Sequence, residues 1–184
     1  MGTIIIKKWR SSSGRAEQWL RITLALILAI SYFGFVHAVS AEGSTRIEGI
    51  AYFAEEGQCT ETANGPDGQD PDFALYMTGD LEGCWYVFVE SAECKPSGVY
   101  LETGTELYVG DGSTDNDGTF RTNYFFSSKY EDCNTLAVEI HGRCQHPIAD
   151  GSGTGDYAGV RGRIDIKDDI AAGNFPYRGN LKFN

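Results

Sequence analysis

The sequence predicts an all-β protein, an eight-stranded antiparallel up-and-down β-barrel preceded by a signal peptide. Three observations support this fold. Apolar and polar side chains alternate with a period of two along several segments, as in half-buried strands. Clusters of Gly, Asp, Asn, Ser and Pro separate these segments at regular intervals. No long helical pattern follows residue 41. Eight consecutive strands with short links fit a barrel that leaves no exposed edge.

The first 41 residues resemble an export signal. An apolar run of about 15 residues, from Ile22 to Val36, precedes two small-residue cleavage patterns that end at Ala38 and Ala41. The run follows a basic segment with Lys7, Lys8, Arg10, Arg15 and Arg21. An uncleaved anchor is the alternative, but the run is shorter than the ~20 residues that span a bilayer. We therefore expect residues 1–41 to be removed, and residues 42–184 to form a single secreted or periplasmic barrel domain without membrane attachment.

The expected strands cover residues 45–54, 73–81, 84–90, 99–109, 119–129, 135–143, 157–167 and 175–183. In the seventh, Val160, Ile164 and Ile166 share one face, and the basic residues among them share the other. In the fourth, the apolar set Val99, Leu101, Leu107 and Val109 alternates with Tyr100, Glu102, Glu106 and Tyr108. This alternation predicts that the apolar set faces the core and that the glutamates face water.

Residues 42–184 are strongly acidic. They contain 10 Lys and Arg against 25 Asp and Glu, a formal charge of about −15. Such a surface stays soluble and repels nucleic acid and anionic lipid, so neither is an expected partner.

The C-terminal segment carries a family resemblance. The glycine-rich run from Gly153 to Gly162 is followed by Phe175, Tyr177, Gly179 and Leu181 at alternate positions. Over residues 153–183 this pattern resembles the signature of allene oxide cyclase-like barrels, and dirigent proteins carry a related segment. The resemblance implies an eight-stranded barrel with an apolar cavity, and some members of the family cyclise or isomerise lipid-derived or polyketide-like substrates. No catalytic or ligand-binding residue is carried over from the family to this chain.

All five cysteines follow the signal, and export makes disulfides the expected state. They are Cys59, Cys84, Cys94, Cys133 and Cys144. Since five is odd, one cysteine stays free or pairs between chains. Successive links of a meander alternate between the two ends, which favours Cys59–Cys94 first and Cys94–Cys133 second. Cys84–Cys144 requires loops that fold over the barrel mouth. Cys84–Cys94 and Cys133–Cys144 would each span a strand and are disfavoured.

Two segments are candidate ion sites. His141, Cys144 and His146 offer two imidazoles and a thiol, but their spacing matches no strong metal motif, so we predict no metal there. The turn Ser113–Gly118 resembles half of a calcium loop, but the twelfth position is Tyr124 where a bidentate Glu is required. A hairpin turn with Gly118 at positive φ is the expected structure, and a weak surface calcium site is the alternative.

Glu102, Glu106, Glu139 and His141 are the titratable residues on predicted strands that would act as acid and base if they faced a cavity. Their apolar neighbours place them in water instead. No cofactor motif is present. The sequence therefore predicts a secreted barrel that binds a small apolar ligand or has a structural role. The alternatives are an allene oxide cyclase-like isomerase or cyclase and, more weakly, a surface interaction protein.

Export is directly testable. We expect N-terminal sequencing of the exported protein to begin between Ala38 and Glu42, because both cleavage patterns end there. A product that begins at Met1 would contradict the cleavable signal.

Overall fold

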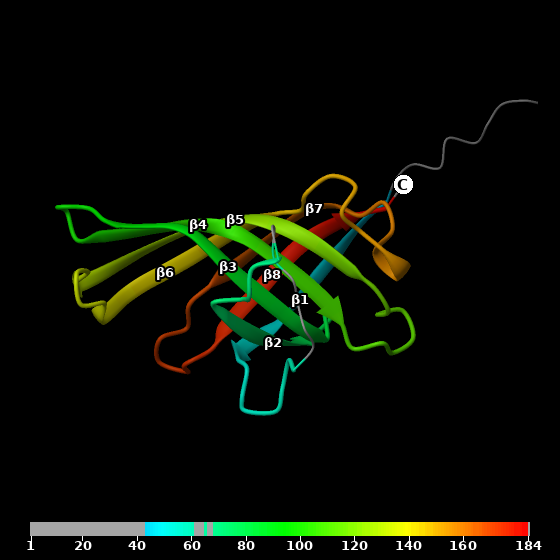
Figure 1. Ribbon diagram of the computed structural model, residues 1–184, viewed down its shortest axis with the longest axis horizontal. Helices are drawn as coiled ribbons and strands as arrows, with labels where there is room; N and C mark the ends of the chain where they lie inside the picture. The colour runs from blue at the N-terminus through cyan, green and yellow to red at the C-terminus, as the bar shows by residue number, and fades with distance from the viewer. Residues whose placement is uncertain (1–42, 61–64, 66–67, 184) are drawn as a thin grey trace, which may run out of the picture. The chain divides into compact units, whose positions relative to one another are not determined.

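In the computed structural model, which describes residues 43–60, 65 and 68–183, eight strands form a closed barrel (Figure 1). Each strand pairs antiparallel with its sequence neighbours, and β8 returns to pair with β1. The predicted all-β, up-and-down barrel is therefore confirmed. The strands are β1 Ser44–Phe53, β2 Phe73–Gly79, β3 Gly83–Cys94, β4 Val99–Gly110, β5 Thr119–Asp132, β6 Ala137–Pro147, β7 Arg161–Lys167 and β8 Phe175–Lys182.

The connections add little helix. A 3₁₀ turn, η2 Gly155–Tyr157, lies between β6 and β7. Within the described ranges, no helix is long and apolar enough to cross a membrane. The expected signal peptide and its cleavage site lie outside the described residues.

The strand bounds differ most from the prediction in three places. β3 continues to Cys94, past its predicted end at residue 90, because a bulge between Val89 and Ser91 lets pairing with β4 resume. β6 ends at Pro147 instead of Arg143. Residues 157–160 precede β7 instead of belonging to it. Strands β3 to β6 are therefore longer than the other four, and their hairpins project beyond the barrel (Figure 1).

One end of the barrel is closed by buried aromatic rings. Tyr108 stacks on Phe120 at 4.8 Å between ring centroids, and Tyr157 of η2 packs edge-on against both. Asn116 in the β4–β5 turn points into the barrel. Its side-chain oxygen accepts hydrogen bonds from the hydroxyls of Tyr108 and Tyr157. The segment read as half of a calcium loop is thus a hairpin turn, and Gly118 has the predicted positive φ of 147°.

The facing of β4 is the reverse of the prediction. Glu106 and Tyr108 lie inside the barrel and are 2% and 1% exposed, whereas Leu107 and Val109 pack outside it against Tyr86 and Phe88. The β1–β2 connection covers this outer patch. A Cβ added to Gly65 would lie 2.5 Å from the Phe88 ring, so the connection is in close contact with it. A covered outer face is why β4 has apolar residues on its outward side.

The same covering explains the disulfide that we predicted wrongly. Cys59 of the β1–β2 connection bonds Cys84 on β3, not Cys94. Our expectation kept each link at its own end of the barrel, but this link folds back along the outer face, where Cys59 meets the outer patch. The second-choice pair, Cys94–Cys133, is present, and Cys144 is free and buried.

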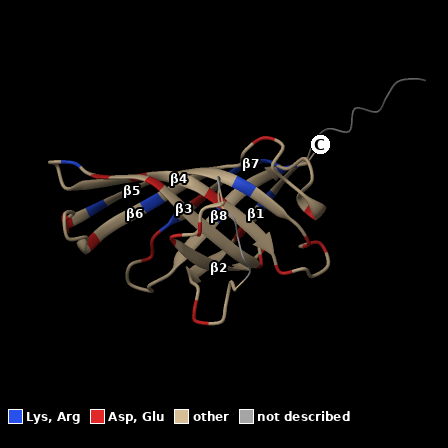
Figure 2. Ribbon diagram, viewed as in Figure 1, with Lys and Arg blue, Asp and Glu red and all other residues tan. Residues whose placement is uncertain are grey.

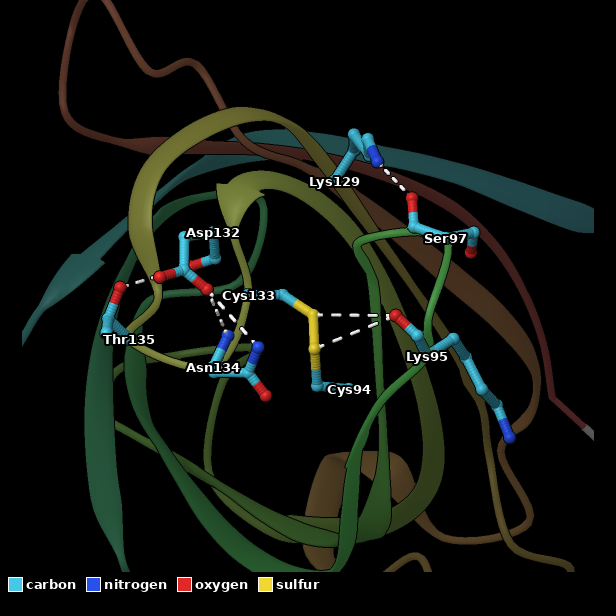
Figure 3. Close-up of a disulfide and its surroundings, with 8 residues drawn as sticks. All are labelled: Cys94, Lys95, Ser97, Lys129, Asp132, Cys133, Asn134 and Thr135. Atoms are coloured by element: carbon cyan, nitrogen blue, oxygen red, sulfur yellow. Dashed lines mark hydrogen bonds between the residues drawn. A yellow bond between two sulfur atoms is a disulfide. The ribbon is translucent and has the colours of Figure 1, made fainter.

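The Cys94–Cys133 bridge joins the ends of the projecting hairpins. Figure 3 shows the bridge beside the β3–β4 turn, with the Lys95 carbonyl oxygen 3.8 Å from the sulfur of Cys94 and 3.9 Å from that of Cys133. Lys129 of β5 donates a hydrogen bond to the Ser97 carbonyl in the same turn. The bridge therefore ties the β5–β6 turn to the end of β3.

We expect the paired substitution of Cys59→Ser with Cys84→Ser to lower the free energy of unfolding by about 3 to 4 kcal/mol, because the bridge closes a long loop of the unfolded chain. The sequence separation is 25 residues, against 39 for Cys94–Cys133, whose removal serves as the comparison. Urea denaturation measures both. A Cys59–Cys94 peptide in a non-reducing map would contradict this pairing.

Candidate functional site

At the end of the barrel opposite the aromatic closure, which we call the open end, interior-facing rings of the described residues meet solvent. Phe53, Phe73 and Phe175 stand on interior-facing positions there, yet Phe53 is 61% exposed and Phe73 is 38% exposed. The Phe53 ring contacts Phe73 and Phe175, with centroids 5.9 and 5.0 Å apart. We call these three rings the aromatic rim. Below them, Val89 and Phe126 are only partly buried against the core.

A buried acid–base pair lies deeper in the barrel. Nδ1 of His146 on β6 is 2.7 Å from Oε2 of Glu106 on β4, and each residue is 2% exposed. The Thr122 hydroxyl, directly opposite Glu106 on β5, donates to the same carboxylate oxygen. An ionised carboxylate can only accept hydrogen bonds, so beside ionised Glu106 the hydrogen of the neutral imidazole lies on Nδ1.

The second nitrogen of His146 has no hydrogen-bond partner among the described residues. Nε2 is buried, and so is the equally unpartnered Nε1 of Trp85. The Trp85 ring packs edge-on against the imidazole at 5.4 Å, and the Tyr124 ring lies nearly parallel to it at 6.3 Å. Buried polar atoms are normally paired, so these two nitrogens mark the place where a bound molecule would find a partner.

A second glutamate connects the buried pair to the open end. Glu102 accepts hydrogen bonds from the hydroxyls of Tyr124 at 2.8 Å and Tyr100 at 2.6 Å. Burial, reinforced by this carboxylate, raises the pKa of both tyrosines, so both stay protonated as donors. Gly104, between the two glutamates, makes room for the Tyr124 ring, since a Cβ there would lie 2.7 Å from that ring.

A pair of carboxyl groups lies near the start of the β7–β8 connection. Desolvation raises the pKa of Asp168 to about 7, with a hydrogen bond and repulsion from Glu139 adding to the effect. Glu139 also accepts a 2.7 Å hydrogen bond from the buried Ser128 hydroxyl. Both side chains are half-buried, and the raised pKa keeps Asp168 protonated until near neutral pH.

The structure separates the residues of the candidate metal segment. Cys144 and His146 face the interior, while His141 is exposed. Within the described part of the chain, no group of three or more His, Cys, Asp or Glu side chains is placed to hold a metal ion. Burial raises the pKa of the Cys144 thiol, which therefore stays protonated and is a poor nucleophile.

The acid–base candidates are distributed differently from the prediction. We placed Glu102, Glu106 and Glu139 in water, and this is wrong for all three, because they stand on interior-facing positions. His141 is exposed as expected. Thr122, Tyr124 and Trp85 belong to no motif that marks them as site residues. The one signal available in the sequence is that they alternate with outward-facing residues along β3 and β5, on the same side as other aromatic residues.

The arrangement is suited to proton transfer or to binding a polar group in an apolar setting. With Nδ1 donating to Glu106, Nε2 of the neutral imidazole is an acceptor, and after protonation it is a donor. An anchored imidazole with one free nitrogen is the usual form of a general base.

The Asp168 carboxyl makes a testable contribution to pH-dependent stability. Its pKa is raised in the folded state. Its contribution to the free energy of unfolding is therefore full below pH 3.8 and is lost as the pH rises through about 7. We expect Asp168→Asn to become more stable relative to the native protein between about pH 4 and about pH 7. Urea denaturation across this range measures the difference, and the exposed Asp150→Asn is the control. A constant difference across the range would contradict the raised pKa.

Comparison with known proteins leaves the chain without a family assignment. No protein-family model, no curated protein and no solved structure matches it. The structure shows the eight-stranded barrel that the resemblance in residues 153–183 implies. The two disulfides indicate an oxidising compartment outside the cytoplasm.

Proposed function

We propose that this protein is a secreted or periplasmic barrel that binds a small, largely apolar molecule through its open end. The observation that carries the proposal is the buried Nε2 of His146, which has no partner among the described residues, on an imidazole held by Glu106 and packed against the rings of Trp85 and Tyr124. Small-molecule sites combine an apolar lining with a few convergent polar groups, and this interior has that composition.

The chemistry of the ligand follows from the protonation of the pair. Because Glu106 holds the Nδ1 hydrogen, Nε2 accepts, and the matching ligand group is a hydroxyl or another donor. The rest of the ligand meets the Trp85 and Tyr124 rings and the aromatic rim, which favour a flat or unsaturated skeleton. A hydrogen bond to a buried acceptor is worth about 0.5–1.5 kcal/mol net, so a hydroxyl should strengthen binding by about three- to tenfold.

Compartment and family are part of the same proposal. The basic, apolar N-terminal segment and the two disulfides support export. The glycine-rich resemblance and the closed eight-stranded barrel support membership of the allene oxide cyclase-like barrels.

The binding test uses Trp85, the only tryptophan of residues 42–184 and a direct neighbour of His146. The purified exported protein is titrated with 2-naphthol and with naphthalene, which differ by one hydroxyl, while Trp85 fluorescence is recorded. We expect both to quench Trp85, and 2-naphthol to bind about three- to tenfold more tightly.

The matched variants are His146→Phe and His141→Phe, one buried and one exposed on the same strand. His146→Phe should abolish the preference for 2-naphthol, and His141→Phe should keep it. A preference that survives in His146→Phe would show that another group recognises the hydroxyl. If neither probe quenches Trp85 in the native protein, the binding proposal is wrong.

An isomerase or cyclase of the allene oxide cyclase-like type is the second candidate. The specific observation that favours it is the carboxylate–imidazole pair in a dry, aromatic setting, where it would move a proton between two positions of a bound substrate. A product of unchanged mass should then form with the native protein and not with Glu106→Gln, although Glu106→Gln still quenches on binding. Equal product formation by both would exclude the pair as the catalytic group.

A further inference from the structure

A separate feature lies on the outside of the barrel. Seven of the ten Lys and Arg residues of 42–184 stand on the adjacent strands β6, β7, β8 and β1: Arg143, Arg161, Arg163, Lys167, Arg178, Lys182 and Arg46. All seven are exposed. We call this surface the basic face. The acidic residues, in contrast, fall largely in the loops at the strand ends (Figure 2).

The strand register places these side chains next to one another. Arg161 lies directly opposite Lys182, and Arg143 lies directly opposite Lys167. Asn180 lies between Arg163 and Arg46, its two cross-strand partners. Residues directly opposite on antiparallel strands project from the same face, with Cβ atoms about 5 Å apart. The basic residues therefore form a grid over four strands, in which Arg178 lies between two carboxylates, Glu48 and Asp165, its cross-strand partners.

The positive charge of the basic face is only partly neutralised. Arg46 pairs with Glu48 at 3.0 Å and Arg163 pairs with Asp165 at 3.0 Å. Across the described ranges, the other five basic residues of the face form no ion pair. Two of the cross-strand pairs are like-charged, an arrangement that destabilises a sheet. In a domain with 25 acidic residues, partners of opposite charge are abundant, so this segregation points to a partner outside the chain.

The centre of the basic face is hollowed. A shallow pocket of about 320 Å³ lies over β7, β8 and β1 and is lined by Arg46, Asp165, Arg178, Gly179 and Asn180. Guanidinium groups bind carboxylate or sulfate oxygens with two parallel hydrogen bonds, and the amide of Asn180 can pair with hydroxyls. The pocket thus offers both the charge and the hydrogen-bonding groups that an acidic sugar needs.

We propose that the basic face binds an acidic polysaccharide. No aromatic side chain stands among its basic residues to stack on bases, which disfavours single-stranded nucleic acid. The exposed apolar residues of these strands, such as Tyr52 and Ile140, lie beyond the basic grid toward the open end, so the face has no apolar group to insert into a membrane. The disulfides indicate an oxidising compartment outside the cytoplasm, away from the nucleic acids of the cell.

The test measures binding of fluorescein-labelled polygalacturonate to the exported protein by fluorescence anisotropy. Arg178→Gln with Lys182→Gln removes two charges from the basic face, and Lys95→Gln with Lys129→Gln removes two from the β3–β6 hairpins. We expect the Arg178/Lys182 double variant to weaken binding by about tenfold, which is the effect of losing two exposed charge contacts. The Lys95/Lys129 double variant should weaken it by less than about twofold. Unchanged Trp85 fluorescence in both variants confirms that each is folded.

Three results would overturn the proposal. The first is the absence of binding at about 50 mM salt, where charge contacts are strongest. The second is an equal loss in both double variants, which would assign the attraction to overall charge. The third is tighter binding of a single-stranded oligonucleotide or of phosphatidylglycerol vesicles, which would assign the basic face to a different polyanion. Neutral dextran is the control and should not bind.

Discussion

Closure of the sheet between β8 and β1 is the constraint on which the rest of the structure depends. Tyr177 of β8 carries much of it, because its ring lies across Gly49, its register partner on β1, and its hydroxyl reaches the β2–β3 turn. That hydroxyl accepts a hydrogen bond from the Leu81 amide at 2.7 Å and donates one to the Thr78 carbonyl at 3.1 Å. A Cβ at Gly49 would lie 2.4 Å from the hydroxyl, so a glycine there is what allows β8 to reach across β1.

Closure also creates an interior with two different ends. Where the strands end evenly, Tyr108, Tyr157 and Asn116 fill the barrel and satisfy each other's hydrogen bonds. Where β3 to β6 continue past the other strands, interior-facing rings of the described residues, such as Phe53, meet solvent. The Glu106–His146 pair lies next to the closed end, because Trp85 contacts His146 and also the closing rings Tyr108 and Phe120. A polar pair in that position has little structural value, because burying charged groups rarely stabilises a fold.

The outer surface has two regions, and both follow from closure. Over β2, β3 and β4 the β1–β2 connection covers Leu107 and Phe88 and is held by Cys59–Cys84. Over β6, β7, β8 and β1 nothing in the described ranges covers the sheet, and seven of its outward positions are basic. A closed barrel leaves no edge for strand pairing, so contacts with other molecules must use its faces or its open end. The basic face and the open end are physically separate and can be tested independently.

The sequence by itself determined the class and order of the fold, because a period of two, turn residues and eight evenly spaced segments are local signals. It also predicted the interior face of β7 and β8, where Ile164, Ile166 and Leu181 alternate with charges. It predicted the wrong interior face for β4, since apolar side chains line the outward side there and only the folded-back connection shows why. The tertiary structure decided the Cys59–Cys84 bridge and the Glu106–His146 pair, because both join segments far apart in the chain, and local alternation carries no information on such contacts.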